Sequence, residues 1–223
     1  TIFFSIHYLF NNLQKIHNVF NNVQHFLKQD GYCLLTTFDG ETIFKELQQS
    51  PYKRNGLSYL EKKTKDGKLL YTISMTKEYK NKLKQTKQQF LSNESSLAFP
   101  IDVTYETFGT QREYLVNSKF LTNIARLWGL EIVSQEELYK DFDRSIFQNG
   151  SDTFGNLSDY MKNLGTQIYN KLTIDELNKS IMKDFSDYNR YFIFKNRNDT
   201  NVQLSNSLST CKQQLPQSLN TLI

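Results

Sequence analysis

The first forty residues, TIFFSIHYLFNNLQKIHNVFNNVQHFLKQDGYCLLTTFDG (1–40), decide the fold. Two apolar runs, at 1–7 and at Tyr32–Phe38, are rich in the aromatic and β-branched residues that strands favour. Between them, apolar residues recur at helical spacing over 11–29, and Asp30-Gly31 ends that helix. This order of strand, helix and strand predicts a parallel βαβ unit with a right-handed crossover.

The second apolar run is continuous rather than alternating, as in sheets that are covered on both faces. The sequence therefore predicts an α/β fold built on a doubly covered sheet. His7 and Tyr8 end the first predicted strand, and Phe38 and Asp39 end the second. Because parallel strands end at one edge of a sheet, these residues are expected at the edge where open α/β sheets bind ligands.

The middle of the chain is less regular. A short helix is expected at 41–48, and a hairpin at 57–75 that turns at Lys65-Asp66-Gly67. The lysine-rich segment 78–97 suits either an RNA-facing surface or a solvated insertion. A strand is expected at 101–108, followed by a loop that ends at Glu113.

The last third begins with a helical stripe from Leu115 to Trp128, which Gly129 closes. Short strands are expected at 130–133 and 188–194, with mixed helix and loop between them. Residues 198–223 are polar and without periodicity, which predicts a disordered tail.

Composition excludes several classes of protein. No apolar run approaches the roughly 18–20 residues that a membrane helix needs. The net charge of +4 is compatible with a nucleic-acid partner but does not require one. Cys33 and Cys211 lie far apart, which argues against a disulfide framework or a zinc site and favours a reducing compartment, the cytoplasm or else the nucleus.

The usual catalytic motifs are absent from the sequence: HExxH, CxxC, GxxxxGK[ST], GxSxG and GxGxxG. The three histidines cannot cluster, because His17 and His25 lie in the predicted first helix and His7 in the strand before it. Neither metal catalysis nor hydrolysis by a Ser-His-Asp triad is therefore supported.

Polar and aromatic residues at strand ends form the remaining candidate site. A carboxylate at Glu113 offers acceptor oxygens that match the N1–H and N2–H₂ donors of guanine, and flanking rings supply a stacking face. In the alternative interpretation, His7 and Tyr8 merely cap a strand and Glu113 is an acid at a helix N-terminus. The predicted set consists of His7, Tyr8, Asp39 and Glu113, ringed by Phe4, Phe38 and Tyr105.

Four segments resemble the mRNA cap guanine-N7 methyltransferases, most closely those of viral multifunctional capping enzymes. They are FSIHYLF (4–10), LKQDGYCLLTTFDGE (27–41), REYLV (112–116) and YFIF (191–194), in this order and roughly the family's spacing. The combination of F-x-x-H-Y, T-T-x-D-G and E-Y-L-V is specific to the family, although each motif alone is weak. The resemblance implies a Rossmann-like, class I S-adenosylmethionine-dependent methyltransferase fold.

The resemblance also implies site residues. Phe4, His7 and Tyr8 match positions that shape the cap-guanine pocket, and Glu113 matches the carboxylate that reads the guanine edge. Tyr188 is the nearest candidate for an aromatic that closes over the guanine. For the methyl donor the candidates are Tyr8 and Phe3, where the family usually has glutamine in place of Phe3.

The family's Gly-rich donor loop is missing from these 223 residues. We therefore expect 1–197 to be the C-terminal portion of a cap methyltransferase domain, with 41–100 a variable insertion and the fragment alone inactive. The resemblance implies S-adenosylmethionine as co-substrate, no metal and no membrane. It implies the capped 5′ end of RNA as partner, with a fused or associated guanylyltransferase, triphosphatase or stimulatory subunit.

Two other functions stay open on the sequence. The chain could be a catalytically inactive methyltransferase-like subunit that stimulates a capping partner. The missing donor loop and Phe3 favour this alternative. It could also belong to an enzyme of this fold that methylates another purine or a small molecule.

Overall fold

A computed structural model of the chain describes residues 2–3, 6–64, 66–105, 109–142, 147–164 and 186–197. The helices are α1 (Ile6–Leu9), α2 (Leu13–Phe26), α3 (Gly40–Gln49), α4 (Lys77–Gln85), α5 (Ser118–Leu127), α6 (Gln135–Asp141) and α7 (Phe154–Leu164), with a 3₁₀ turn at Glu94–Ser96. The strands are β1 (Ile2–Phe3), β2 (Tyr32–Phe38), β3 (Lys53–Arg54), β4 (Leu57–Lys63), β5 (Leu69–Met75), β6 (Pro100–Tyr105), β7 (Gly109–Tyr114), β8 (Leu130–Ile132), β9 (Ser151–Thr153) and β10 (Asn189–Asn196).

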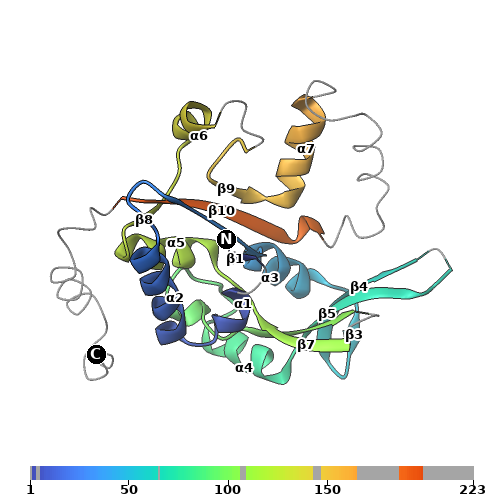
Figure 1. Cartoon of the computed structure of the whole chain (residues 1–223). Coiled ribbons are helices and arrows are strands. Elements are labelled where there is room, and N and C mark those ends of the chain that lie inside the picture. Colours follow the sequence, from blue (N-terminus) through green and yellow to red (C-terminus); the bar gives the residue numbers. More distant parts are fainter. Residues whose placement is uncertain are drawn as a thin grey trace.

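The central sheet has the strand order β1-β2-β10-β8, and β9 also pairs with β10 (Figure 1). β1 runs parallel to β2, with Phe3 opposite Thr36, so the predicted βαβ unit is confirmed. β10 runs antiparallel to β2, β8 and β9, which makes the sheet mixed. The expected α/β class is thus confirmed.

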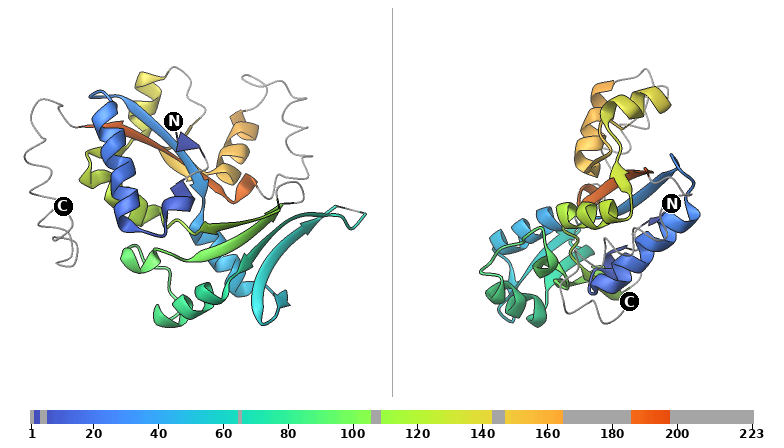
Figure 2. Two further views of the ribbon diagram at one scale, coloured as in Figure 1. Left: turned by 60° about the horizontal axis from the view of Figure 1, so that its bottom comes forward. Right: turned by 90° about the vertical axis from the view of Figure 1, so that its left-hand side faces the viewer.

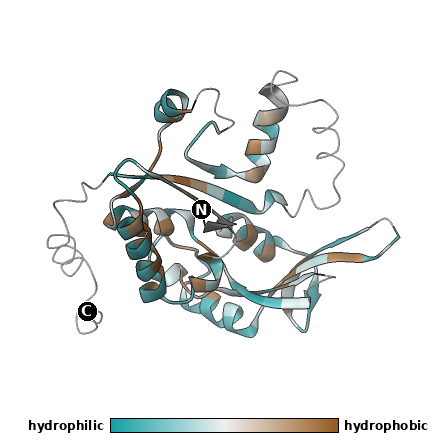
Figure 3. Ribbon diagram, in the orientation of Figure 1, coloured by the Kyte–Doolittle hydropathy of each residue, from teal (hydrophilic) through white to brown (hydrophobic). Residues whose placement is uncertain are grey.

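Both faces of the central sheet are covered, as the continuous apolar strand predicted. Phe192 and Phe194 of β10 belong to a buried cluster with residues of α2 and α5. Tyr191 and Ile193 point to the other face and pack with Leu138 of α6. In Figure 1, α6 and α7 lie above β10, while α2 and α5 lie below it. Figure 3 shows that these helices carry both hydrophilic and hydrophobic residues, as amphipathic covering helices do.

The first long helix follows its sequence pattern. Asn12 caps α2 by accepting a hydrogen bond from the backbone N–H of Lys15, and this sets the helix start. Ile16 and Phe20, one helical turn apart, are fully buried. At the end of the helix Phe26 is 81% exposed, so Leu27 and not Phe26 continues the apolar stripe.

The start of the chain differs from the prediction of a strand over 1–7. β1 ends at Phe3, and His7 and Tyr8 lie in the short helix α1. Ile6, His7 and Phe10 are buried whereas Tyr8 is 43% exposed. This is the burial pattern of a helical turn, because a strand would place residues 6, 8 and 10 on one face.

A second, antiparallel sheet has the order β3-β4-β5-β6-β7 and extends away from the central sheet (Figure 2, left). The predicted hairpin at 57–75 forms β4 and β5. The predicted loop at 109–113 is wrong, because β7 pairs with β6 along its whole length. Cross-strand contacts stabilise that pairing: Arg112 with Asp102, and Thr104 with Thr110. Glu113 therefore lies in a strand, and the helix it was expected to begin starts at Ser118.

Several predictions fall outside the described residues. These concern Phe4, Lys65, Cys211 and the tail at 198–223. Within the described part of the chain, no helix is both long and apolar enough to span a bilayer.

Gly40, directly after β2, is expected to tolerate no side chain. A Cβ atom there would lie 2.3 Å from the backbone oxygen of Val116, which accepts a hydrogen bond from the Gly40 N–H. We expect Gly40→Ala to lower the free energy of unfolding by about 1–3 kcal/mol, since backbone must move to admit the methyl group. Urea unfolding measures this effect.

Gly155 in α7 supplies the matched control, because a Cβ atom there would meet its nearest neighbour at 3.6 Å. Gly155→Ala should be neutral or stabilising by up to about 1 kcal/mol, as alanine favours the helix. Equal stability of the two variants would show that the contact between Gly40 and Val116 does not constrain the fold.

Candidate functional site

A cavity of about 300 Å³ lies where α1, the end of β2 and the second sheet meet the start of β10. Five of its lining residues were predicted from the sequence, and two were not. The predicted ones are His7, Tyr8, Phe38, Tyr105 and Glu113, and the others are Ser186 and Asn189. The structure thus brings together residues that are more than 100 positions apart in the chain.

Glu113 is the acidic group of this cavity, and it is only 2% exposed. The Tyr8 hydroxyl donates to its Oε1 at 3.4 Å, and His7 Nε2 lies 3.5 Å from its Oε2. Among the described residues, Oε2 has no hydrogen-bond partner. Burial raises the pKa of Glu113 to about 7, and the hydrogen bond from Tyr8 partly opposes that rise.

His7 is a second buried polar group beside the carboxylate. It is 4% exposed, and its ring stacks on Phe38 with 5.7 Å between centroids. Burial lowers the pKa of His7 to about 4, so the imidazole is neutral at pH 7. Neither ring nitrogen has a hydrogen-bond partner in the described part of the chain. Since buried polar atoms are normally paired, His7 and Glu113 stand out as groups of this cavity with unused hydrogen-bonding capacity among the described residues.

Aromatic rings form the walls around these polar groups. Phe38 and Tyr105 line the cavity, and the centroid of the Tyr8 ring lies 4.3 Å from the centroid of the His7 ring. Burial, with the nearby Glu113, raises the pKa of Tyr105, so its phenol stays protonated at neutral pH. Rings beside a hydrogen-bonding carboxylate suit a flat ligand with donor groups along one edge.

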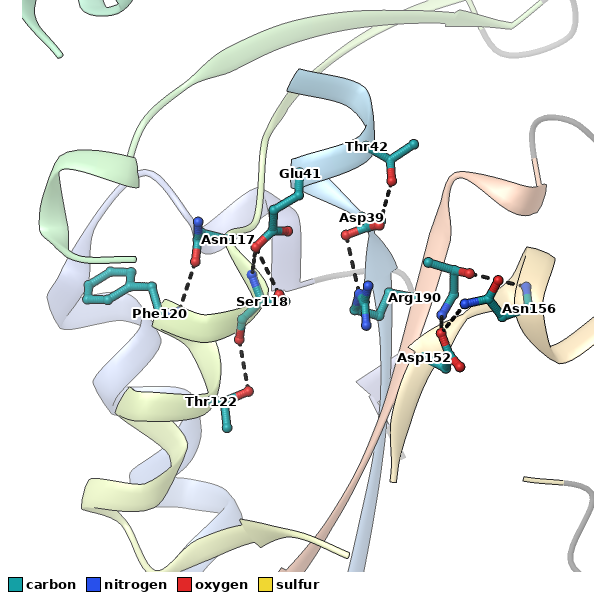
Figure 4. Close-up of polar contacts among 11 residues, drawn as sticks. Asp39, Glu41, Thr42, Asn117, Ser118, Phe120, Thr122, Asp152, Asn156 and Arg190 are labelled. Atoms are coloured by element: carbon teal, nitrogen blue, oxygen red, sulfur yellow. Dashed lines mark hydrogen bonds and ion pairs between the residues drawn. The ribbon is translucent and has the colours of Figure 1, made fainter. Parts of the chain in front are cut away.

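Asp39, another sequence candidate, does not line this cavity. Its carboxylate pairs with Arg190 Nε at 3.2 Å and accepts a hydrogen bond from Thr42 at 2.7 Å (Figure 4). Its backbone N–H donates to the carbonyl oxygen of Tyr188. Asp39 therefore joins the end of β2 to the start of β10, and so supports the two strand ends that carry Phe38 and Asn189.

Glu41, two residues on, fixes the start of α5. It accepts hydrogen bonds from both the backbone N–H and the hydroxyl of Ser118, at 2.9 and 2.8 Å (Figure 4). The segment that follows β2 is thus connected to two elements: Glu41 contacts the start of α5, and Asp39 contacts β10.

Tyr188 lies outside the cavity and lines a neighbouring hollow, where its hydroxyl donates to Glu46. Ser186 and Asn189, on either side of Tyr188 in the chain, line the cavity instead. The only sequence signal for Asn189 is a polar residue at the start of a buried apolar strand. Phe4 is outside the described residues, and Phe3 is described only by its pairing in β1.

The described residues contain no group of three or more His, Cys, Asp or Glu side chains that could hold a metal ion. Of the two residues expected from the resemblance to contact the methyl donor, Tyr8 lines the cavity and is partly exposed.

A protein-family model described as the mRNA (guanine-N(7))-methyltransferase domain matches residues 1–195. The match includes every residue that lines the cavity. No curated protein matches the chain.

Proposed function

The chain belongs to the mRNA (guanine-N7)-methyltransferase family, and from this premise we propose that the cavity around Glu113 holds the guanine of the 5′ cap. The family is one of enzymes that use S-adenosylmethionine as co-substrate and bind capped RNA. An inactive stimulatory subunit is not favoured by this membership. The methyltransferase fold expected from the sequence agrees with the mixed α/β structure.

One observation carries the proposal: the buried carboxylate of Glu113 lines an aromatic cavity, and one of its oxygens has no hydrogen-bond partner among the described residues. Ionised Glu113 can accept the N1–H and N2–H₂ hydrogens of guanine, while Phe38 and Tyr105 flank the ring. Adenine offers no comparable pair of donors at that edge, so the arrangement favours guanine.

Methyl transfer to guanine N7 requires the protein mainly to orient the two reactants. Guanine N7 carries a lone pair at neutral pH, so no general base is needed. S-adenosylmethionine supplies the methyl group. Holding the reacting atoms in line and excluding water can contribute on the order of 7–11 kcal/mol. Methylation leaves a positive charge on the guanine ring, which the carboxylate of Glu113 stabilises.

Two ligand titrations against the full chain test this function. We expect the cap analogue GpppG to bind at least about tenfold more tightly than ApppA, because adenine lacks the pair of donors that Glu113 can accept from guanine. S-adenosylmethionine is titrated separately, because enzymes of this family use it as co-substrate. Equal affinity for GpppG and ApppA would overturn the guanine assignment.

Three further expectations remain predictions. They are the division of the chain into a methyltransferase portion at 1–197 with an insertion at 41–100, the association with guanylyltransferase, triphosphatase or stimulatory partners, and a cytoplasmic location. Copurification of capping activities with the tagged chain tests the second of these.

A further inference from the structure

A second hollow, of about 270 Å³, lies next to the guanine cavity. α3, the β4–β5 hairpin and the start of β10 contribute to it. Its principal lining residues are Glu46, Glu61, Tyr52, Leu60, Tyr71 and Tyr188. The proposed guanine site uses none of these residues. The resemblance had assigned Tyr188 to the guanine, but Tyr188 lines this second hollow instead.

The two hollows share a partition. Tyr105 of the guanine cavity lies directly opposite Tyr71 of the second hollow in the pairing of β6 with β5. Such strand partners are about 4.5–5.5 Å apart, measured between Cβ atoms. Along the chain, Asn189 lines one hollow and its neighbour Tyr188 lines the other. A ligand with two linked groups can therefore place one group on each side of this partition.

The second hollow repeats the chemistry of the first. The rings of Tyr71 and Tyr188 meet edge to face with 6.4 Å between centroids, and Tyr52 is 52% exposed. The Glu46 carboxylate accepts a hydrogen bond from the Tyr188 hydroxyl, and its remaining lone pairs can accept hydrogen bonds from further donors. Aromatic faces beside a carboxylate suit a nucleobase that carries an exocyclic amine. Two carboxylates disfavour a phosphate in the hollow itself.

We propose that the second hollow binds the base of the first transcribed nucleotide, so that GpppN occupies both sites at once. This inference rests on the proposed cap-guanine function of the first cavity. In the pairing of β4 with β5, Lys62 lies opposite Tyr71, on the side of Tyr71 away from Tyr105, so this cation lies at the outer end of the strand row and not between the two hollows. Adenine, guanine and cytosine carry an exocyclic amine that can donate a hydrogen bond to the Glu46 carboxylate, whereas uracil has no such amine.

Calorimetric titration of the full chain with GTP, GpppA and GpppU tests the inference. We expect GpppA to bind more tightly than GTP or GpppU. Tyr52→Ala should weaken GpppA binding at least about fivefold through lost stacking and leave GTP binding unchanged. Glu46→Gln should remove the preference for GpppA over GpppU. Tyr139→Ala, which truncates an exposed tyrosine outside both hollows, is the matched control and should change nothing.

The outcomes separate this inference from the function on which it rests. If GTP and GpppA bind the wild-type chain equally, or if Tyr52→Ala weakens both ligands alike, the second site is wrong while the guanine site stands. If GTP and GpppA both fail to bind the wild-type chain, the proposed function fails and the inference fails with it.

Discussion

Replacing Glu113 by glutamine is expected to lower the affinity for GpppG by about 100-fold or more, since two hydrogen bonds to a charged acceptor are lost. The amide nitrogen of glutamine would also face a guanine donor. Methyl transfer from S-adenosylmethionine should fall by a similar factor. Titration of the cap analogue and a methyl-transfer assay measure the two effects.

The same substitution is expected to stabilise the fold at pH 8. Burial raises the pKa of Glu113 to about 7, above its usual value of 4.5. The unfolded chain therefore releases the proton first, and stability is lost as the pH rises from about 4.5 through 7. A neutral glutamine avoids that loss, which is on the order of 3 kcal/mol above pH 7. Urea unfolding at pH 8 measures it.

Glu137→Gln serves as the control for Glu113→Gln. Glu137 accepts a hydrogen bond from Arg197 at 2.6 Å, and this bond lowers its pKa. Removing that charge should bring no gain in stability and no change in cap binding. A Glu113→Gln chain that binds GpppG like the wild type would contradict the site.

The affinity for GpppG is expected to depend on pH between about 5 and 7. Only the ionised carboxylate of Glu113 accepts both guanine donors, and its pKa is about 7. Affinity should therefore rise about tenfold per pH unit below that value and level off above it. The pKa of His7, about 4, keeps that group neutral over the whole range. Calorimetry in buffers of matched ionisation enthalpy gives the profile.

Two variants make this profile specific. Tyr8→Phe should move its midpoint to higher pH, because the Tyr8 hydroxyl holds the pKa of Glu113 down. Glu113→Gln should flatten the profile. A wild-type affinity that is constant from pH 5 to 8 would show that Glu113 does not control cap binding.

The sequence predicts which side chains meet at the site better than it predicts their local structure. His7, Tyr8 and Phe38 come together because both strands of the βαβ unit end at one edge, and that follows from chain order alone. The four-residue helix α1 is too short for periodicity to separate it from a strand. β7 carries the polar sequence GTQREY, so its hydrogen bonds to β6 leave no apolar signal.

The end of the chain shows a different limit. The run at 188–194 predicts a buried strand, and β10 (Asn189–Asn196) confirms it. Its antiparallel direction has no signature in the sequence, because it depends on how the chain returns to the sheet. Nor does the run say which face each residue takes. A shift of one residue exchanges the two faces, and here Asn189 takes the cavity side where Tyr188 was expected.

The most direct test of the central claim is a double-mutant cycle between Glu113 and the guanine 2-amino group. The affinities of the wild-type chain and Glu113→Gln are measured for GpppA and for IpppA, in which hypoxanthine lacks that amine. We predict that IpppA binds the wild type at least about fivefold more weakly than GpppA, and that Glu113→Gln binds both alike, a coupling of about 1 kcal/mol or more. The same ratio of affinities in both proteins would contradict the reading of the guanine edge by Glu113.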